Sequence, residues 1–213
     1  FHEIAHGWTA LALGDPTAKE QRRLSLNPLR HVDPFGTLIL PGLLALAGAP
    51  VFGWAKPVPV VQQRLRNPRF GMMAVAAAGP LTNLVMAAVG AVAIGLLVRG
   101  GAPADASVGG FTVLAFSYFV AINVFVAFFN LLPIPPFDGS HIVEGLLPRS
   151  WAAAYGKLRG VGMALFFVLV ALSWYGPTSG ILGHVIGPPV EWMLGRVVSL
   201  VDWVAGWHYT LAD

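Results

Sequence analysis

Residues 70–98 read FGMMAVAAAGPLTNLVMAAVGAVAIGLLV, an uncharged run rich in alanine, valine and leucine. The hydrocarbon core of a bilayer is roughly 30 Å thick, and about 20 apolar residues in a helix cross it. The run is long enough for one crossing with some tilt. It therefore predicts a membrane-spanning helix, around which the rest of the chain has to be arranged.

The composition of the whole chain agrees with this prediction. Of its 213 residues, 56% are hydrophobic and only 11% are charged, whereas about one-quarter of the residues of soluble chains are charged. A net charge of +3 on so apolar a chain indicates contact with lipid headgroups rather than nucleic acid, and we find no basic stripe interleaved with stacking aromatics. Because the chain has no cysteine, any metal must be bound by histidine and carboxylate side chains.

Further apolar segments extend the pattern on both sides. Residues 111–132 are long enough to cross a membrane, and residues 161–175 are long enough with their flanks. Residues 181–204 carry three charged side chains, so we expect them to cross obliquely or to lie partly at the interface. Residues 1–13 predict a helix of about 20 Å, too short for a span, so we expect an N-terminally truncated chain.

The basic residues indicate which loops face the cytoplasm. Eight of the thirteen lysine and arginine residues lie in residues 14–69 and three lie in residues 133–160, whereas loops 99–110 and 176–180 hold only Arg99. By the positive-inside rule, the two basic stretches are cytoplasmic.

The apolar segment 35–54 is broken by proline and glycine and lies inside the first basic stretch. A single crossing would place half of that positive charge on the wrong side, so we expect the segment to enter the membrane and return. We therefore predict an all-α polytopic membrane protein. It is a helix bundle of about five to six transmembrane segments with a re-entrant, partly extended loop region at residues 25–69.

Residues 2–6 read HEIAH, an HExxH motif. Side chains four residues apart share one face of a helix, so the imidazoles of His2 and His6 can both reach one Zn²⁺ ion. Glu3 then lies beside the metal, where it can take a proton from water and deliver it to a leaving amine. Three ionisable residues within five positions of an apolar segment are costly, which favours a functional role over histidines that face headgroups.

A catalytic zinc ion has three protein ligands and one open position, so a third ligand must lie elsewhere. The candidates near apolar segments are Asp138, His141, Glu144, His184 and Glu191. Asp138 follows NLLPIPPF at 130–137, whose three prolines prevent a continuous helix and allow the carboxylate to turn back into the bundle. We expect Gly139 to take a positive φ and residues 140–147 to form a short helix. The alternative to a metal-ligand role for Asp138 is that it caps the N-terminus of this helix.

HEIAH at 2–6 together with NLLPIPPFDG at 130–139 resembles the site-2 protease family of intramembrane zinc metalloproteases, whose signature joins HExxH to a distant DG motif. AGPLTN at 78–83 is similar to the GPxxN motif of that family. The stretches LNPLRHVDPFGT at 26–37 and FGWAKPVP at 52–59 continue the resemblance, which covers about residues 1–145.

The resemblance implies a Zn²⁺ ion at His2, His6 and Asp138, with Glu3 as the base, and cleavage of a peptide bond inside or beside the membrane. It also implies that Asn83 holds the substrate backbone or the oxyanion, although a helix–helix contact would satisfy a buried amide equally well.

The expected partners are the lipid bilayer and a single-span membrane protein substrate. The family further implies regulated proteolysis in a bacterial inner membrane, with the active site toward the cytoplasmic side. The sequence does not indicate an oligomeric state.

We find no internal repeat and no long polar linker. We therefore expect one integral-membrane metalloprotease domain over residues 1–213, with a core over residues 1–145 and C-terminal helices over residues 160–204.

The remaining polar motifs each have two interpretations. Residues 56–61 are biased toward extended backbone, whose free edge could pair with a substrate strand, or they form an interface loop. His31 and Asp33 could bind a metal, but capping or turn roles are commoner in such loops. We expect packing or interface roles for the other histidines, His141, His184 and His208. The first of these, three residues after Asp138, is also a candidate to support the metal ligands.

Two other functions use the same residues. Intramembrane ionisable groups also mark ion or proton transporters, although these commonly contain repeats. The third possible function is that of a non-catalytic membrane scaffold, but the presence of Glu3 argues against it.

Overall fold

The computed structural model describes residues 1–48, 51, 53–101, 108–175 and 180–207. The chain forms two compact units, Phe1–Gly79 and Pro80–Asp213. Every regular element among the described residues is helical, which confirms the all-α prediction. The long helix α4, Pro68–Arg99, begins in the first unit and continues into the second.

The first unit starts with α1, His2–Ala12, as the HExxH segment predicts. The helix ends where Gly14 takes a φ of +106°, a conformation that favours glycine. Buried Ala10, Leu65 and Val75 form an apolar cluster that joins α1 to the start of α4. The other helices of this unit are short: α2 (Thr17–Glu20), η1 (Pro28–His31), η2 (Pro34–Ile39), α3 (Leu40–Leu46) and η3 (Gln62–Arg64).

The predicted loop region combines these short helices with non-helical backbone. η2 and α3 together make an apolar helix over Pro34–Leu46. The Trp54 amide donates to the Gly36 carbonyl at 3.1 Å, and the Thr37 hydroxyl donates to the Trp54 carbonyl at 2.8 Å. The two ends of segment 36–54 therefore lie together, while its entry into the membrane stays a prediction.

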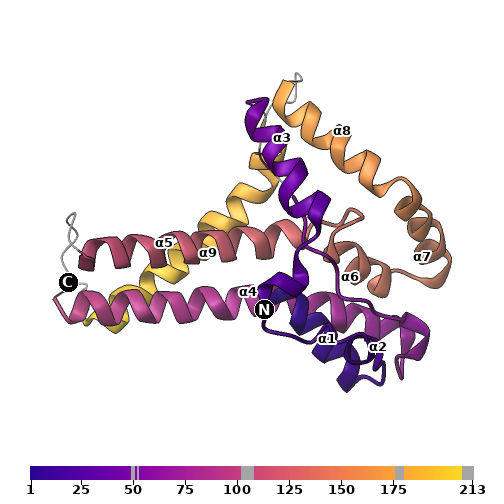
Figure 1. Cartoon of the computed structure of the whole chain (residues 1–213), viewed down its shortest axis with the longest axis horizontal. Helices are drawn as coiled ribbons and strands as arrows, with labels where there is room; N and C mark the ends of the chain where they lie inside the picture. The colour runs from indigo at the N-terminus through magenta and orange to yellow at the C-terminus, as the bar shows by residue number, and fades with distance from the viewer. Residues whose placement is uncertain (49–50, 52, 102–107, 176–179, 208–213) are drawn as a thin grey trace. The chain divides into compact units, whose positions relative to one another are not determined.

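The second unit is built around α4, α5 (Val108–Asn130) and α9 (Ile181–Ala205), which Figure 1 shows as its long helices. Their contact is made by small and β-branched side chains: Ala87, Ala91, Ile94, Val120, Val124 and Val197. The helices pack closely at Gly90, where a Cβ atom would lie 2.8 Å from the Val120 side chain. Glycine is used in the same way at Gly95, where a Cβ would lie 2.6 Å from Val204.

Helices α6 (Asp138–Leu146), α7 (Arg149–Gly156), η4 (Lys157–Gly160) and α8 (Gly162–Tyr175) complete the second unit. Residues 131–137 are not helical, as their prolines predict. Phe137 packs edge-on against Phe129 of α5 and Phe166 of α8, with ring centroids 4.7 and 5.2 Å apart. These aromatic contacts hold the turn between α5 and α6 in place.

Two details of this turn differ from the sequence-based expectation. α6 begins at Asp138, and its N-cap is Phe137, so the alternative role of Asp138 as N-cap is not observed. Gly139 lies inside α6 without a positive φ. A Cβ at Gly139 would collide with the Leu131 carbonyl, so glycine is needed because the backbone folds back tightly on itself.

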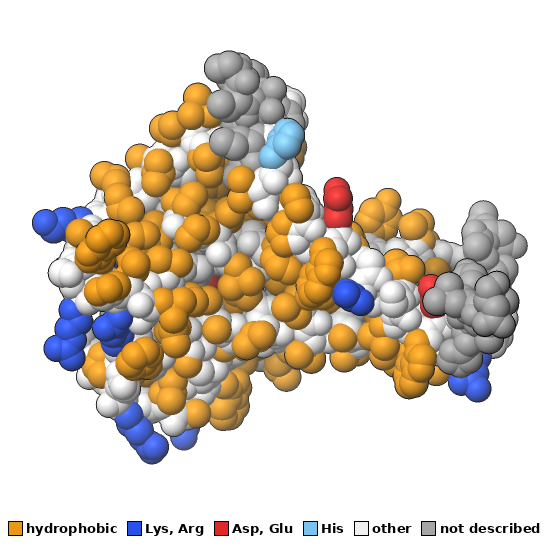
Figure 2. Space-filling view, turned by 180° about the vertical axis from the view of Figure 1, so that it is seen from behind, with side chains coloured by type: hydrophobic (Ala, Val, Ile, Leu, Met, Phe, Trp, Pro, Cys, Tyr) orange, Lys and Arg blue, Asp and Glu red, His pale blue; other side chains and the backbone are white. Residues whose placement is uncertain are grey.

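Two helices among the described residues, α4 and α5, are long and apolar enough to cross a membrane. A third span is possible if α7–η4 and α8, which are bent by 71°, count as one broken span. The count of five to six segments is therefore not confirmed. Figure 2 shows hydrophobic side chains spread across the visible face, as expected for a protein in contact with lipid.

We predict that Gly95→Ala destabilises the second unit, because the added methyl group meets Val204 of α9 with no space to fill. The loss of unfolding free energy should be about 1–3 kcal/mol, measured by thermal or denaturant unfolding in detergent. Gly195→Ala is the matched control, since no atom lies within 4 Å of its Cβ position on α9. An unchanged stability of Gly95→Ala would contradict the packing described here.

Candidate metal centre

His2 and His6 lie one turn apart on α1, as the HExxH spacing predicts. Their ring centroids are 4.7 Å apart and the rings are nearly perpendicular, at 83°. Both side chains therefore occupy one face of the helix, where two imidazoles can share one ion.

The orientation of the His6 ring is set by α4. Its Nδ1 atom lies 2.7 Å from the carbonyl oxygen of Val75, and since a carbonyl can only accept, Nδ1 carries the proton. The lone pair is then on Nε2, the nitrogen that can bind a metal. A ligand histidine held in this way by a backbone carbonyl is the usual arrangement in zinc proteins.

Gly79 of α4 shows where the two imidazoles converge. A Cβ atom at this position would lie 2.5 Å from Nε2 of His2 and 2.5 Å from Nε2 of His6. The two ligand nitrogens therefore lie beside the same bare stretch of α4. Two imidazoles with converging Nε2 atoms fit a zinc ion, which takes nitrogen ligands readily. The sequence alone does not reveal this role of Gly79.

Glu3 is held by a backbone amide from a distant part of the first unit. The N–H of Val58 donates to its Oε2 at 3.0 Å. One carboxylate oxygen is thereby oriented, while α1 carries the group next to His2. The sequence does not reveal this hydrogen bond, because 55 residues separate its partners.

The other two predicted site residues belong to the second unit. Asp138 is the first residue of α6, and Asn83 lies in α4 with only 5% of its surface exposed. Their association with the histidines of α1 stays a prediction.

The remaining polar motifs have local roles. Oδ1 of Asp33 accepts from the amides of Phe35 and Gly36, at 3.1 and 2.7 Å, so its capping role is confirmed. His31 Nε2 lies 2.8 Å from the Ser25 carbonyl, a bond within the same loop.

The histidines of the second unit bond to near neighbours. His184 Nδ1 lies 2.9 Å from the Gly180 carbonyl, and His141 Nδ1 accepts from Arg159, which also pairs with Glu144. His208 lies outside the described residues.

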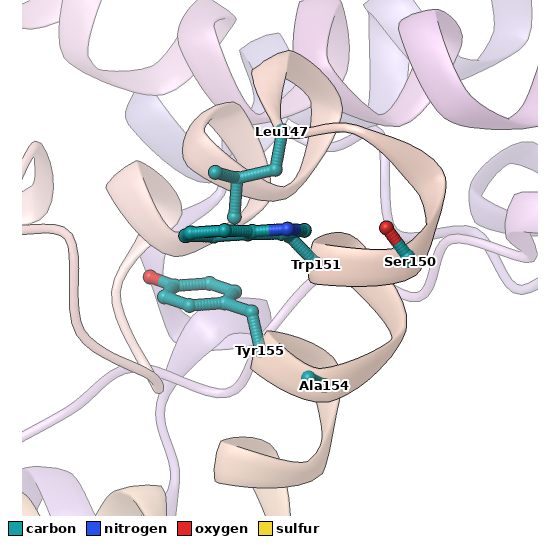
Figure 3. Close-up of a pocket in the computed structure, with 5 residues that line it drawn as sticks. All are labelled: Leu147, Ser150, Trp151, Ala154 and Tyr155. Atoms are coloured by element: carbon teal, nitrogen blue, oxygen red, sulfur yellow. The ribbon is translucent and has the colours of Figure 1, made fainter.

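A separate hollow of about 520 Å³ lies on α7 and is lined by Leu147, Ser150, Trp151, Ala154 and Tyr155. Figure 3 shows the rings of Trp151 and Tyr155 facing one another beneath Leu147. The hollow is mainly apolar and has no histidine or carboxylate in its lining, so it does not offer a metal site.

The HExxH helix and its paired imidazoles define a zinc metalloprotease type of site. Comparisons with known proteins agree. Residues 102–173 match Peptidase family M50. The chain is 39% identical over 169 residues to "Putative zinc metalloprotease YwhC" of Bacillus subtilis, which covers 79% of this chain and 74% of the relative.

It is 31% identical over 170 residues to "Putative zinc metalloprotease Rip2" of Mycolicibacterium smegmatis, which covers 80% of this chain and 62% of the relative. No solved structure matches the chain. The chain thus belongs to peptidase family M50, the site-2 protease family. It is a metalloprotease, and its metal is Zn²⁺.

We predict that Gly79→Ala removes zinc from the protein. The new methyl group would displace both Nε2 atoms, and because these are the ends of side chains that can rotate away once the His6–Val75 bond breaks, the backbone of α1 and α4 can stay in place. Metal analysis of the purified variant should show well under one zinc ion per chain. Gly42→Ala adds the same methyl where no atom lies within 4 Å and should keep the parental zinc content. Full zinc occupancy in Gly79→Ala would show that the imidazoles do not bind metal from this position.

Proposed function

We propose that this protein is an intramembrane zinc metalloendopeptidase that cleaves a peptide bond in or near the transmembrane segment of a membrane-anchored substrate. The observation that supports this most strongly is the convergence of the His2 and His6 nitrogens at Gly79, with Glu3 on the same helix. The family supports membrane proteins as substrates.

In this proposal His2, His6 and Asp138 hold the zinc ion. When bound, the ion acts as a Lewis acid that polarises the scissile carbonyl and makes water a stronger nucleophile at neutral pH. The position of Asp138 at the start of α6, directly after a proline-rich turn, suits a ligand that must be aimed by rigid backbone.

Glu3 is the proposed general base. Because the Val58 amide occupies Oε2, the other oxygen is available to take the proton of the attacking water and to return it to the leaving amine. Asn83, a buried amide on a mostly apolar helix, is proposed to donate to the substrate carbonyl as negative charge develops there.

The substrate we propose is a single-span membrane protein, as in regulated intramembrane proteolysis. A transmembrane helix hides its amides in hydrogen bonds, and hydrolysis needs water at a depth where hydrocarbon excludes it. The non-helical segments 55–61 and 131–137 suit the wet, irregular surroundings that such an enzyme needs.

We further propose that the protein crosses a bacterial inner membrane five to six times and opens its active site toward the cytoplasm. The basic residues of 14–69 and 133–160 support this orientation. α4 and α5 then supply two of the crossings.

We predict that Glu3→Gln abolishes cleavage but keeps zinc. The substitution removes the base and leaves both imidazoles of α1 unchanged. The test compares the full-length protein and the variant in liposomes, by zinc content and by cleavage of a single-span substrate. Glu20→Gln, at an exposed surface pair with Arg64, is the charge-matched control and should cleave normally. Cleavage by Glu3→Gln at the parental rate would disprove the mechanism and favour a transporter or scaffold.

We predict that single cysteines at Lys19 and Arg149 face the same side of the membrane and that one at Arg99 faces the other. The chain has no cysteine of its own, so each engineered thiol can be labelled without background. A membrane-impermeant maleimide should label Arg99→Cys in intact spheroplasts and the other two only after lysis. Labelling of Lys19→Cys and Arg149→Cys from opposite sides would refute the proposed topology.

A further inference from the structure

The non-helical segment Lys56–Val61 passes beside Glu3, and its amide at Val58 is the donor to Glu3 Oε2. Pro57 and Pro59 have no N–H, and three of the four remaining amides of the segment donate within the first unit. The segment therefore offers few donors to an added substrate strand, which weighs against a free pairing edge. Its internal bonds instead indicate that something fixes its position.

Arg23 holds the N-terminal end of this segment. Its guanidinium donates to the carbonyls of Lys56, at 2.6 Å, and Pro57, at 3.4 Å, and also to the carbonyl of Arg30. The side chain is only 9% exposed. A planar guanidinium can reach several carbonyls at once in fixed directions, which makes it suited to hold backbone in place.

Asp15 holds the C-terminal end. Its Oδ2 accepts from the Val61 amide at 2.6 Å, and its Oδ1 accepts from the amide and the hydroxyl of Thr17. The carboxylate is fully buried. Burial by itself would raise the pKa of Asp15, but the hydrogen bonds from Thr17 and Val61 and the charge of Arg64 outweigh it, so the pKa is lowered. Asp15 is therefore ionised at neutral pH, and its bond to Val61 is charge-assisted.

We propose that Asp15 and Arg23 are positioning residues that clamp the two ends of segment 56–61 and so hold the Val58 amide against Glu3. The clamp acts on catalysis only through the carboxylate of Glu3, and in this respect it rests on the proposed protease function. Neither Asp15 nor Arg23 has to touch the substrate or the metal.

The physical reason for such a clamp is the weak internal structure of the segment. It forms no helix or strand, and its two prolines remove donors that could have tied it to a neighbour. The place of the Val58 amide is thus set by the bonds at the two ends together with the packing of the Val58 side chain against Gly7. A displacement of about 1 Å at a reacting group can cost up to a hundredfold in rate.

The test uses Asp15→Asn and Arg23→Lys in the full-length protein. Asn keeps the shape of Asp15 but cannot accept from both Thr17 and Val61, because one of its two polar atoms is now a donor. Lys replaces the planar fork by a single ammonium group. Each variant should lower kcat for a single-span substrate by roughly ten- to a hundredfold, with KM and zinc content unchanged. Glu20→Gln is the control, because it removes an exposed carboxylate at the end of α2 that pairs with Arg64 rather than with segment 56–61.

A second comparison separates the clamp from a general loss of stability. Glu3→Asp withdraws the carboxylate from Val58 by one methylene, so adding Asp15→Asn to it should give no further loss of kcat. An equal loss of kcat in both backgrounds would mean that Asp15 does not act through Glu3, and the proposal would be overturned.

Hydrogen exchange gives a readout that needs no catalysis. Both clamp variants should speed amide exchange in residues 56–61 while α1 keeps its protection. Parental exchange and parental kcat in both variants would overturn the clamp. If the parent itself binds zinc but does not cleave, the proposed function fails, whereas faster exchange in the variants would still support the clamp.

Discussion

The close approach of α1 to α4 is the constraint on which the rest of the first unit depends. On one face of α1 the imidazole nitrogens meet the bare backbone of Gly79, and His6 bonds to the Val75 carbonyl one turn earlier. On another face, Gly7 lets Leu24 and Val58 approach so closely that a Cβ atom would collide with Leu24 and crowd Val58. Helix α1 thus packs between α4, which orients His6, and segment 56–61, which orients Glu3. Small residues on both sides make this geometry possible in a chain whose other contacts are mostly apolar.

The polar residues buried in the first unit are concentrated around this helix. Asp15, Arg23 and His6 are each less than a tenth exposed, and each bonds to backbone groups distant in the sequence. Burying such groups is costly unless their hydrogen bonds are made, and apolar residues of similar size would contribute more to stability. Each of the three makes at least one bond to a segment that positions His6 or lies beside Glu3: His6 to the Val75 carbonyl, and Arg23 and Asp15 to segment 56–61. We infer that they are present for the geometry of the site more than for stability of the fold.

The sequence was sufficient for α1, α4 and α5, because apolar length and HExxH spacing are local signals. It was also sufficient for the break before α6, since three prolines exclude a helix. The sequence-based prediction was wrong at Gly139, where a positive φ was expected. Glycine is needed there because the turn brings the Leu131 carbonyl too close for a side chain. The contacts of the Val58 amide and the Val75 carbonyl could not be predicted from the sequence either. Any residue type supplies these backbone groups, and only the tertiary fold brings them to the site.

The Gly79–Pro80 pair shows how two neighbouring residues act on one helix for different reasons. Gly79 is needed for space, since a side chain there would occupy the place of the imidazole nitrogens. Pro80 is buried inside α4 and has no N–H, so the Ala76 carbonyl cannot receive its usual helical bond from position 80. α4 nevertheless continues to Arg99, because tertiary packing within the second unit supports it. The carbonyl of Val75, next to that interruption, is the one that binds His6. The part of α4 around Pro80 therefore has fewer internal hydrogen bonds, and the same part supplies the carbonyl that binds His6. This explains why a glycine–proline pair is tolerated in the middle of a long apolar helix.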